Sequence, residues 1–240
     1  NTNRKYMIIG INGYAGSGKD TVGTIIQYLK AKPQNTSLED VLDFPLTHQW
    51  WLEDISTWEI KKWAGKLKAI ASMLTGIPQE SFEDQEFKKK YLGSQWAKAG
   101  YDEDKKMHSL KPMTVRDFLQ RLGTDAIRNG LHTNAWVNAL MSDYTPTQVQ
   151  WSDGPLGGYE DGPMPNWIIT DTRFPNEAQA IKDAGGLVIR VDRPGVKPIN
   201  DHPSEVGLDS WNFDYKIANV SDLKALTGTV EMILVKENIL

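Results

Sequence analysis

One stretch near the start of the chain, GYAGSGKDT at residues 13–21, restricts the fold more than any other. It directly follows the apolar run YMIIGI at residues 6–11, which predicts a buried strand. Apolar residues then recur with the spacing of one helix face, at Val22, Ile25, Ile26 and Leu29. The spacing Gly13-x4-Gly18-Lys19 between a strand and a helix is that of a phosphate-binding loop. A glycine-rich turn that only joins the two elements is the alternative, and the complete pattern argues against it.

The residue types in this loop suit an anion. Gly13, Gly16 and Gly18 let successive backbone N–H groups turn toward a phosphate. The helix N-terminus adds about half a positive charge. Lys19 supplies a point charge that can reach the β- and γ-phosphates of a nucleotide.

Asp20 departs from the usual pattern, which has Ser or Thr at this position. A carboxylate in the first helical turn suits the helix dipole, but it repels a triphosphate unless it faces away or meets magnesium through water. Thr21 can supply the missing hydroxyl one residue later. We therefore expect Thr21 and Asp20 on the magnesium side. The order Gly-Lys-x-Thr resembles nucleoside monophosphate kinases, which indicates a small-molecule kinase.

The remainder of the chain alternates between strand and helix patterns. Further strands are expected at residues 58–64, 167–170, 187–191 and 215–219. Helices are expected at residues 65–76, 114–123, around 136–140, at 175–185 and around 223–233. This alternation predicts a parallel sheet covered on both faces. The charged segment 80–112 is expected to be partly helical and mobile, and residues 143–166 to form a long loop or hairpin.

Composition excludes several classes of function. The chain has 240 residues, enough for one large α/β domain or two small ones. A net charge of -4 and a pI near 5.6 argue against nonspecific nucleic-acid binding. The absence of cysteine excludes disulfides and thiolate zinc sites and favours a reducing cytoplasm. No apolar stretch approaches the roughly 18–20 residues of a membrane span, so no membrane partner is expected. The four histidines show no metal-ligand spacing.

The stretch WIITDTRFPNE suggests the acceptor side of such a site. A buried strand delivers Asp171 and Arg173 at its carboxyl end, where open α/β sheets bind ligands. Asp171 can hold magnesium-bound water or a sugar hydroxyl, and Arg173 can clamp a phosphate with two N–H groups. Glu177 can orient that guanidinium. The alternative is that these three side chains form a network of surface charges, which contributes little to the stability of the fold.

The helix TVRDFLQRLG carries two more candidates. Thr114 and Asp117 have capping-box spacing, and Gly123 is placed to end the helix. Arg116 and Gln120 lie one turn apart on the flank of the apolar face, where they can reach a base or phosphate or simply face solvent. Trp136 can stack on a base, although core packing is the commoner use of tryptophan.

Taken together, GSGKDT, VRDFLQRLGTD, TDTRFPNEAQAIKDAGGLVIRVDRPG and DHPSEVGL...YKIAN resemble the bacteriophage deoxynucleoside monophosphate kinases, in the family's order, over residues 7–226. The resemblance implies an α/β fold of the P-loop nucleoside monophosphate kinase type, a three-layer sandwich with a five-stranded parallel sheet. It implies one kinase domain over residues 1–240, with substrate-binding or lid segments at 80–136 and an insertion at 145–166. The implied reaction moves the γ-phosphate of ATP to a deoxynucleoside monophosphate, with Mg2+, in phage DNA precursor synthesis in the host cytoplasm. The family also makes a homodimer an expectation.

The resemblance implies roles for individual residues. Those expected to bind ATP are Gly13, Gly16, Ser17, Gly18, Lys19, Asp20, Thr21 and Arg193. Those expected to bind the deoxynucleotide are Lys68, Arg116, Gln120, Gly123, Trp136, Asp171, Arg173 and Glu177. Lys19, Arg173 and Asp171 would be catalytic. His202 and Glu205 match an H-x-x-E pattern to which no role is assigned.

The chain departs from the family at two places, and two other functions stay open. Ala15 and Gly16 stand where some members carry basic residues, and the 145–166 insertion is longer than expected. One alternative is a kinase of the same fold that acts on dephospho-coenzyme A or phosphomevalonate. The other is a nucleotide-binding module without catalysis, against which the retained Lys19, Asp171 and Arg173 argue. The sequence does not indicate which base is accepted.

Overall fold

The computed structural model describes the chain apart from residues 1–6, 44–50, 53, 103–105, 152–156 and 199–202. The chain divides into two compact units. The first, here called the core unit, consists of Asn1–Trp63 and Met141–Leu240, and the second, the inserted unit, is Ala64–Leu140. The inserted unit contains the predicted substrate segment at 80–136. That both units act as one kinase domain stays a prediction.

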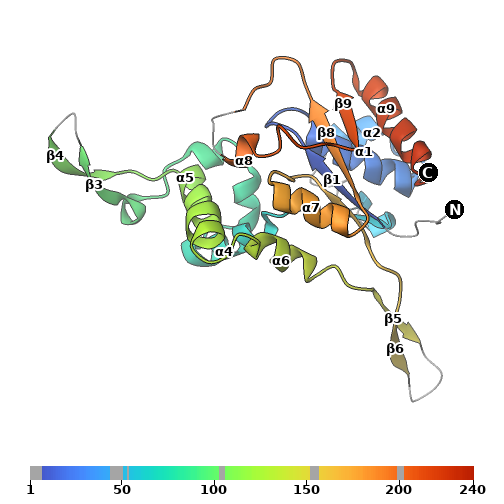
Figure 1. Ribbon diagram of the computed structural model, residues 1–240, viewed down its shortest axis with the longest axis horizontal. Coiled ribbons are helices and arrows are strands. Elements are labelled where there is room, and N and C mark those ends of the chain that lie inside the picture. Colours follow the sequence, from blue (N-terminus) through green and yellow to red (C-terminus); the bar gives the residue numbers. More distant parts are fainter. Residues whose placement is uncertain (1–6, 44–50, 53, 103–105, 152–156, 199–202) are drawn as a thin grey trace. The chain divides into compact units, whose positions relative to one another are not determined.

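A five-stranded parallel sheet forms the centre of the core unit (Figure 1). Its strands are β1 (Ile8–Asn12), β2 (Trp58–Lys61), β7 (Asn166–Ile169), β8 (Leu187–Asp192) and β9 (Tyr215–Ala218). Their order is β2-β7-β1-β8-β9, and every neighbouring pair is parallel. The predicted five-stranded parallel sheet is confirmed. Its strands fall in the segments that the sequence indicated, with β2 covering only the first part of the expected strand at residues 58–64.

Helices cover both faces of this sheet, as Figure 1 shows. The helices of the core unit are α1 (Lys19–Ala31), α2 (Leu38–Asp43), α7 (Pro175–Asp183), α8 (Pro203–Val206) and α9 (Leu223–Lys236). Successive side chains of a strand point to opposite faces. Ile9 and Ile11 of β1 accordingly share a buried cluster with residues of α1 and α9. Between them, Gly10 faces Ile181 of α7, whose Cδ1 leaves no room for a Cβ.

Helix α1 lies unusually close to β7, and a glycine permits this approach. A Cβ on Gly23 would lie 2.5 Å from Cγ2 of Thr170 and 3.5 Å from Cγ2 of Ile168. Both Gly23 and Thr170 are buried. The first turn of α1 is therefore held over the carboxyl end of β7.

The inserted unit has its own small core, formed by Ala71, Phe82, Val115 and Phe118. Its elements are α4 (Gly65–Thr75), three 3-10 turns (Gln79–Glu83, Phe87–Lys89 and Ser94–Trp96), β3 (Lys98–Asp102), β4 (Met107–Lys111), α5 (Val115–Gln120), a π-helix (Arg121–Asn129) and the start of α6 (Ala135–Met141). Strands β3 and β4 pair antiparallel. The charged segment 80–112 is helical in part, as predicted, but the sequence did not indicate this hairpin.

The predicted end of the α5 helix at Gly123 is wrong. The capping box of Thr114 and Asp117 is present, but the helix continues beyond α5 as a π-helix to Asn129. By comparison, the predicted end of α4 at Gly76 is confirmed, because Gly76 caps that helix with a left-handed φ of 73°. Gly123 serves a different purpose, because a Cβ there would lie 2.9 Å from Cδ2 of Leu67 on α4. The glycine allows two helices to approach closely.

The insertion at residues 143–166 forms a hairpin, one of its two predicted forms. Strands β5 (Gln148–Trp151) and β6 (Gly158–Asp161) pair antiparallel.

None of the helices in the described part of the chain combines the length and apolar composition that crossing a membrane requires.

Gly186 provides a test of the packing between β1 and α7. A Cβ there would lie 2.3 Å from the carbonyl oxygen of Ile8 and 2.9 Å from that of Ile181, and backbone atoms cannot swing aside. We expect Gly186→Ala to lower the free energy of unfolding by about 1–3 kcal/mol, measured by urea denaturation. The matched control is Gly228→Ala in α9, where a Cβ meets nothing within 4 Å. It should stabilise by about 0.5–1 kcal/mol, and equal effects of both changes would contradict this packing.

Candidate functional site

The glycine-rich loop at residues 13–18 lies between β1 and α1, and its backbone requires glycine at three places. Gly16 and Gly18 have φ of 84° and 96°, which L side chains rarely adopt. A Cβ on Gly13 would lie 2.4 Å from Oγ of Ser17 and 2.7 Å from the carbonyl oxygen of Val191. The loop therefore has the tight backbone curvature that surrounds an anion.

A hydrogen bond within the loop and a side chain from another segment hold the loop in this shape. The Ser17 N–H donates to the Tyr14 carbonyl at 3.0 Å. Asn219, which directly follows β9, donates its side-chain amide to the Ser17 carbonyl at 2.9 Å. A Cβ on Gly18 would lie 2.6 Å from that amide nitrogen, so Asn219 packs directly on the loop. The loop is thus preorganised by contacts that no ligand has to create.

Helix α1 directs its N-terminus at the loop. Gly18 is the N-cap and has no side chain to satisfy the first-turn N–H groups, which lack partners within the helix. The Lys19 side chain, only 12% exposed, lies at the start of the same turn, and Thr21 is half-buried nearby. Backbone dipoles and a lysine ammonium therefore converge as the sequence predicted, and this arrangement attracts phosphate.

Asp20 is turned toward the end of β7. Its Oδ1 accepts a hydrogen bond from the Thr170 hydroxyl at 2.8 Å. Its Oδ2 lies 3.7 Å from Nζ of Lys19, and the side chain is 63% exposed. The unusual carboxylate is therefore fixed by Thr170 at one oxygen and ion-paired with Lys19 at the other, on a largely exposed side chain.

Asp171 follows Thr170 at the carboxyl end of β7, as predicted, and takes part in the framework of the core unit. Its Oδ1 accepts a hydrogen bond from the backbone N–H of Trp63 at 2.8 Å. The Trp63 indole N–H in turn donates to Oγ1 of Thr172 at 3.3 Å. These bonds fasten the segment after β2 to the end of β7, and a role of Asp171 toward substrate stays a prediction.

Two carboxylates position Arg173. Buried Glu177 accepts hydrogen bonds from the backbone N–H groups of Arg173 at 2.8 Å and Phe174 at 3.1 Å, and so caps α7. The Arg173 guanidinium lies 3.7 Å from a carboxylate oxygen of Glu205 on α8. The glutamate of the H-x-x-E pattern thus gains a role that the sequence did not assign. His202 lies outside the described residues.

Sequence reasoning missed a buried arginine behind the loop. Arg190 lies inside strand β8, among apolar neighbours, and donates to Oδ1 of Asn12 at 2.6 Å and to Oδ1 of Asp192 at 2.7 Å. Its Cζ lies 4.4 Å from the ring centroid of Tyr14, which is a cation–π distance. A charged residue inside the run LVIRV was the signal that could have revealed it, because a buried charge requires partners.

The electrostatics of this arginine are set by its neighbours. Burial works to lower the pKa of the Arg190 guanidinium, but the hydrogen bonds and charges of Asp192 and Tyr14 outweigh it and raise that pKa above its usual value. Burial also raises the pKa of the Tyr14 hydroxyl, which donates to Asp209 at 2.8 Å. Tyr14 therefore stays a neutral donor, and it ties the loop to residues after α8.

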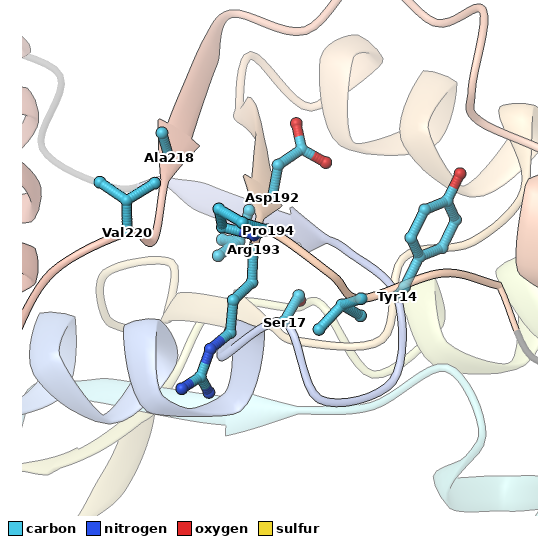
Figure 2. A pocket seen from close by; sticks show the side chains of 9 residues that line it. Tyr14, Ser17, Asp192, Arg193, Pro194, Ala218 and Val220 are labelled. Carbon is cyan, nitrogen blue, oxygen red and sulfur yellow. The ribbon is translucent and has the colours of Figure 1, made fainter.

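A pocket of about 310 Å³ opens beside the loop. Figure 2 shows its lining, which comes from the loop, from the turn after β8 and from the end of β9. The lining residues are Tyr14, Ser17, Val191, Asp192, Arg193, Pro194, Val196, Ala218 and Val220. Arg193 is thereby brought beside the loop, as predicted. The buried Ser17 hydroxyl has no hydrogen-bond partner among the described residues, which is unusual for a buried polar group.

The inserted unit contains the other predicted deoxynucleotide residues. Buried Lys68 forms an ion pair with Glu83, and the Arg116 guanidinium donates to Gln85 at 3.1 Å. The Gln120 side chain is half-buried on α5. The segment at residues 83–85 thus holds two cations that the sequence had assigned to the acceptor.

Trp136 combines packing with a hydrogen bond to another predicted residue. Its ring is buried, as the core-packing alternative expects, and its indole N–H donates to the Gly123 carbonyl at 2.9 Å. The structure therefore brings Trp136 and Gly123 together. Stacking of Trp136 on a base stays a prediction.

The fold and this loop define an α/β protein of the P-loop class. A family model described as deoxynucleotide monophosphate kinase matches residues 60–230, which is more than half of the chain. The chain therefore belongs to the deoxynucleotide monophosphate kinase family.

Individual relatives agree with this assignment. The deoxynucleotide monophosphate kinase of Enterobacteria phage T4 is 33% identical over 118 residues, 49% of this chain and 44% of its own length. A protein of Acanthamoeba polyphaga mimivirus is 34% identical over 114 residues, 44% of this chain and 53% of its own length. This chain thus spans about half the length of these two relatives. The deoxynucleoside-5'-monophosphate kinase of Escherichia phage T5 is 26% identical over 90% of both chains.

Arg190 and Arg193 allow a matched test of the network behind the loop. Arg190→Met leaves the side-chain amide oxygen of Asn12 and the Asp192 carboxylate without the Arg190 donor, so we expect a loss of about 1–3 kcal/mol in the free energy of unfolding. Arg193→Met changes an exposed residue and should stay within about 0.5 kcal/mol of the unsubstituted protein. Urea denaturation measures both. Similar values for the two variants would mean that Arg190 does not organise this region.

Proposed function

We propose that this chain transfers the γ-phosphate of ATP to a deoxynucleoside monophosphate in phage DNA precursor synthesis. The observation that carries the proposal is the preorganised loop with Lys19 at the start of a 13-residue helix, in a chain of this family. Family membership favours a deoxynucleotide acceptor over dephospho-coenzyme A or phosphomevalonate. It likewise disfavours a binding module without catalysis.

On the donor side, the loop would hold the phosphates of ATP. The residues proposed for this are Gly13, Gly16, Ser17, Gly18, Lys19, Asp20, Thr21 and Arg193. Three features support the assignment: the required glycines, the open N-terminus of α1 and the adjoining pocket. The pocket volume of about 310 Å³ is enough for a base, and Ser17 is among its lining residues (Figure 2).

On the acceptor side, positive charge and hydrogen-bond donors are proposed to hold the deoxynucleotide. The residues are Lys68, Arg116, Gln120, Gly123 and Trp136 in the inserted unit, and Asp171, Arg173 and Glu177 in the core unit. Glu205 supports Arg173 in this proposal, because its carboxylate restricts the guanidinium to one region. A held guanidinium loses less side-chain entropy when it binds phosphate.

The reaction places few chemical demands on the protein. An oxygen of the acceptor phosphate attacks the γ-phosphorus, the bond to the β–γ bridging oxygen breaks, and ADP and a deoxynucleoside diphosphate leave. Magnesium, when bound with ATP, neutralises charge on the β- and γ-phosphates. Lys19 and Arg173 would stabilise the charge that develops on the transferred group, and the loop amides would orient that group.

A homodimer, expected from the resemblance, stays a prediction that light scattering can test.

A coupled ADP-release assay tests the reaction. With ATP and Mg²⁺ present, we expect ADP formation with one or more of dAMP, dGMP, dCMP and dTMP, and none with dephospho-coenzyme A or phosphomevalonate. Lys19→Ala should lower kcat by about 10²–10³, because a charge at the transferring phosphate is lost. Turnover only with the two control acceptors would reassign the substrate. Tight ATP binding without turnover on any acceptor would support a binding module instead.

Arg173 separates the acceptor side from the donor side. Arg173→Ala should lower kcat/KM for the deoxynucleotide by about 10²-fold or more while leaving the Kd for ATP within about twofold. Steady-state kinetics and calorimetry measure the two quantities. The control is Lys182→Ala, at the other end of α7. It removes an ion pair with Asp214 and should leave the activity unchanged. An unchanged kcat/KM in Arg173→Ala would remove this arginine from the site.

A further inference from the structure

Thr170 and Asp20 form a pair whose chemistry the proposed function does not yet use. Thr170 follows β7, the neighbour of β1 in the sheet, so it lies at the edge from which the phosphate loop emerges. Its side chain is buried, and its hydroxyl donates to Oδ1 of Asp20 at 2.8 Å. The pair joins the first turn of α1 to the adjacent strand.

Asp20 and Thr170 stand in exchanged places, while Thr21 offers a further hydroxyl in the first turn of α1. P-loop proteins commonly hold magnesium with a Ser or Thr hydroxyl on the loop and an Asp carboxylate on a neighbouring strand. Here the carboxylate, Asp20, is on the loop helix and the hydroxyl, Thr170, is at the strand end. The strand also ends in Asp171, but Oδ1 of that carboxylate accepts the Trp63 N–H and braces the sheet edge.

We propose that Thr170 is a positioning residue that fixes Asp20 so that its second oxygen meets the magnesium ion of the bound nucleotide, directly or through one water. This inference rests on the proposed function, because it requires a magnesium nucleotide at the loop. Three observations on Asp20 support it: Oδ1 is held by Thr170, Oδ2 is engaged only by the Lys19 ammonium at 3.7 Å, and the side chain is largely exposed beside the phosphate loop. Carboxylate oxygen is a ligand that Mg²⁺ prefers, and one or two carboxylates suffice when phosphates complete the shell.

The packing around Thr170 explains why its hydroxyl can hold Asp20 in one place. Asp20 and Gly23 are three residues apart and lie on one face of α1, over Thr170. Because Gly23 has no side chain, the methyl group of Thr170 fits beneath the helix and its hydroxyl points at Asp20. Oδ2 of Asp20 already lies at an ion-pair distance of 3.7 Å from Nζ of Lys19. Without the Thr170 bond, both carboxylate oxygens would be free to turn to this ammonium and to draw it from the phosphates.

Two substitutions at one position isolate the hydroxyl. Thr170→Val keeps the shape and removes the donor, whereas Thr170→Ser keeps the donor. The Kd for ADP is measured by calorimetry with Mg²⁺ and with EDTA, so that no acceptor and no turnover are needed. We expect Thr170→Val to weaken binding with Mg²⁺ by about tenfold, the value of one hydrogen bond to a charged group, and to leave binding in EDTA within about twofold. Thr170→Ser should restore the Mg²⁺ effect.

A double-mutant cycle tests whether Thr170 acts through Asp20. In an Asp20→Asn background, Thr170→Val should change the Mg²⁺-dependent affinity by less than about twofold, because the group that it positions no longer carries the charge. Equal loss of affinity with Mg²⁺ and in EDTA would mean that the substitution only distorts the loop, and would overturn the inference. So would an unchanged Mg²⁺ effect in Thr170→Val, or additive losses in the double variant.

The outcome is separable from that of the proposed function. If no deoxynucleotide is phosphorylated but the Mg²⁺ effect depends on the Thr170 hydroxyl, the inference holds and the acceptor assignment fails. If deoxynucleotides are phosphorylated and Thr170→Val retains the full Mg²⁺ effect, the function holds and the inference fails. A protein that binds ADP equally with Mg²⁺ and in EDTA would also overturn the inference.

Discussion

The parallel pairing of β1 with β7 on one side and β8 on the other is the constraint on which the candidate site depends. Parallel strands end at the same edge of a sheet, so the segments that follow these three strands meet there. They are the phosphate loop after β1, the turn after β7 and the turn after β8 (Figure 1). Asp171 and Arg173 belong to the second segment, and Arg193 belongs to the third. Residues far apart in sequence thus lie at the same edge of the sheet.

Charged groups in the core unit divide into those that are buried in the framework and those that are exposed beside the loop. Glu177 caps α7, Asp171 braces the end of β2, and Arg190 joins the loop to β1 and β8. Each is buried and hydrogen-bonded, as buried charges must be. Asp20 differs because it is held at one oxygen and exposed. A site built in this way is preorganised, so that binding energy is not consumed in ordering it.

Several features were predictable because their causes are local. Apolar runs gave the sheet strands, the loop spacing gave the turn from β1 into α1, and Thr114 with Asp117 gave a capping box. The error at Gly123 has a physical origin, since glycine serves a close helix contact as well as it serves a helix end. The β3–β4 hairpin was missed because KAGYD and MHSLK lack the alternation that marks a half-buried strand.

By itself, the sequence determined the strand–loop–helix unit, the parallel sheet and the residue types of a phosphate site, because each depends on spacing along a few neighbouring residues. Only the tertiary structure decided which carboxylate faces which partner. Glu205 meets Arg173, Asp171 meets Trp63, and Thr170 meets Asp20. These pairings depend on strand order and on the approach of α1 to β7, and the spacing of residues along the chain contains neither.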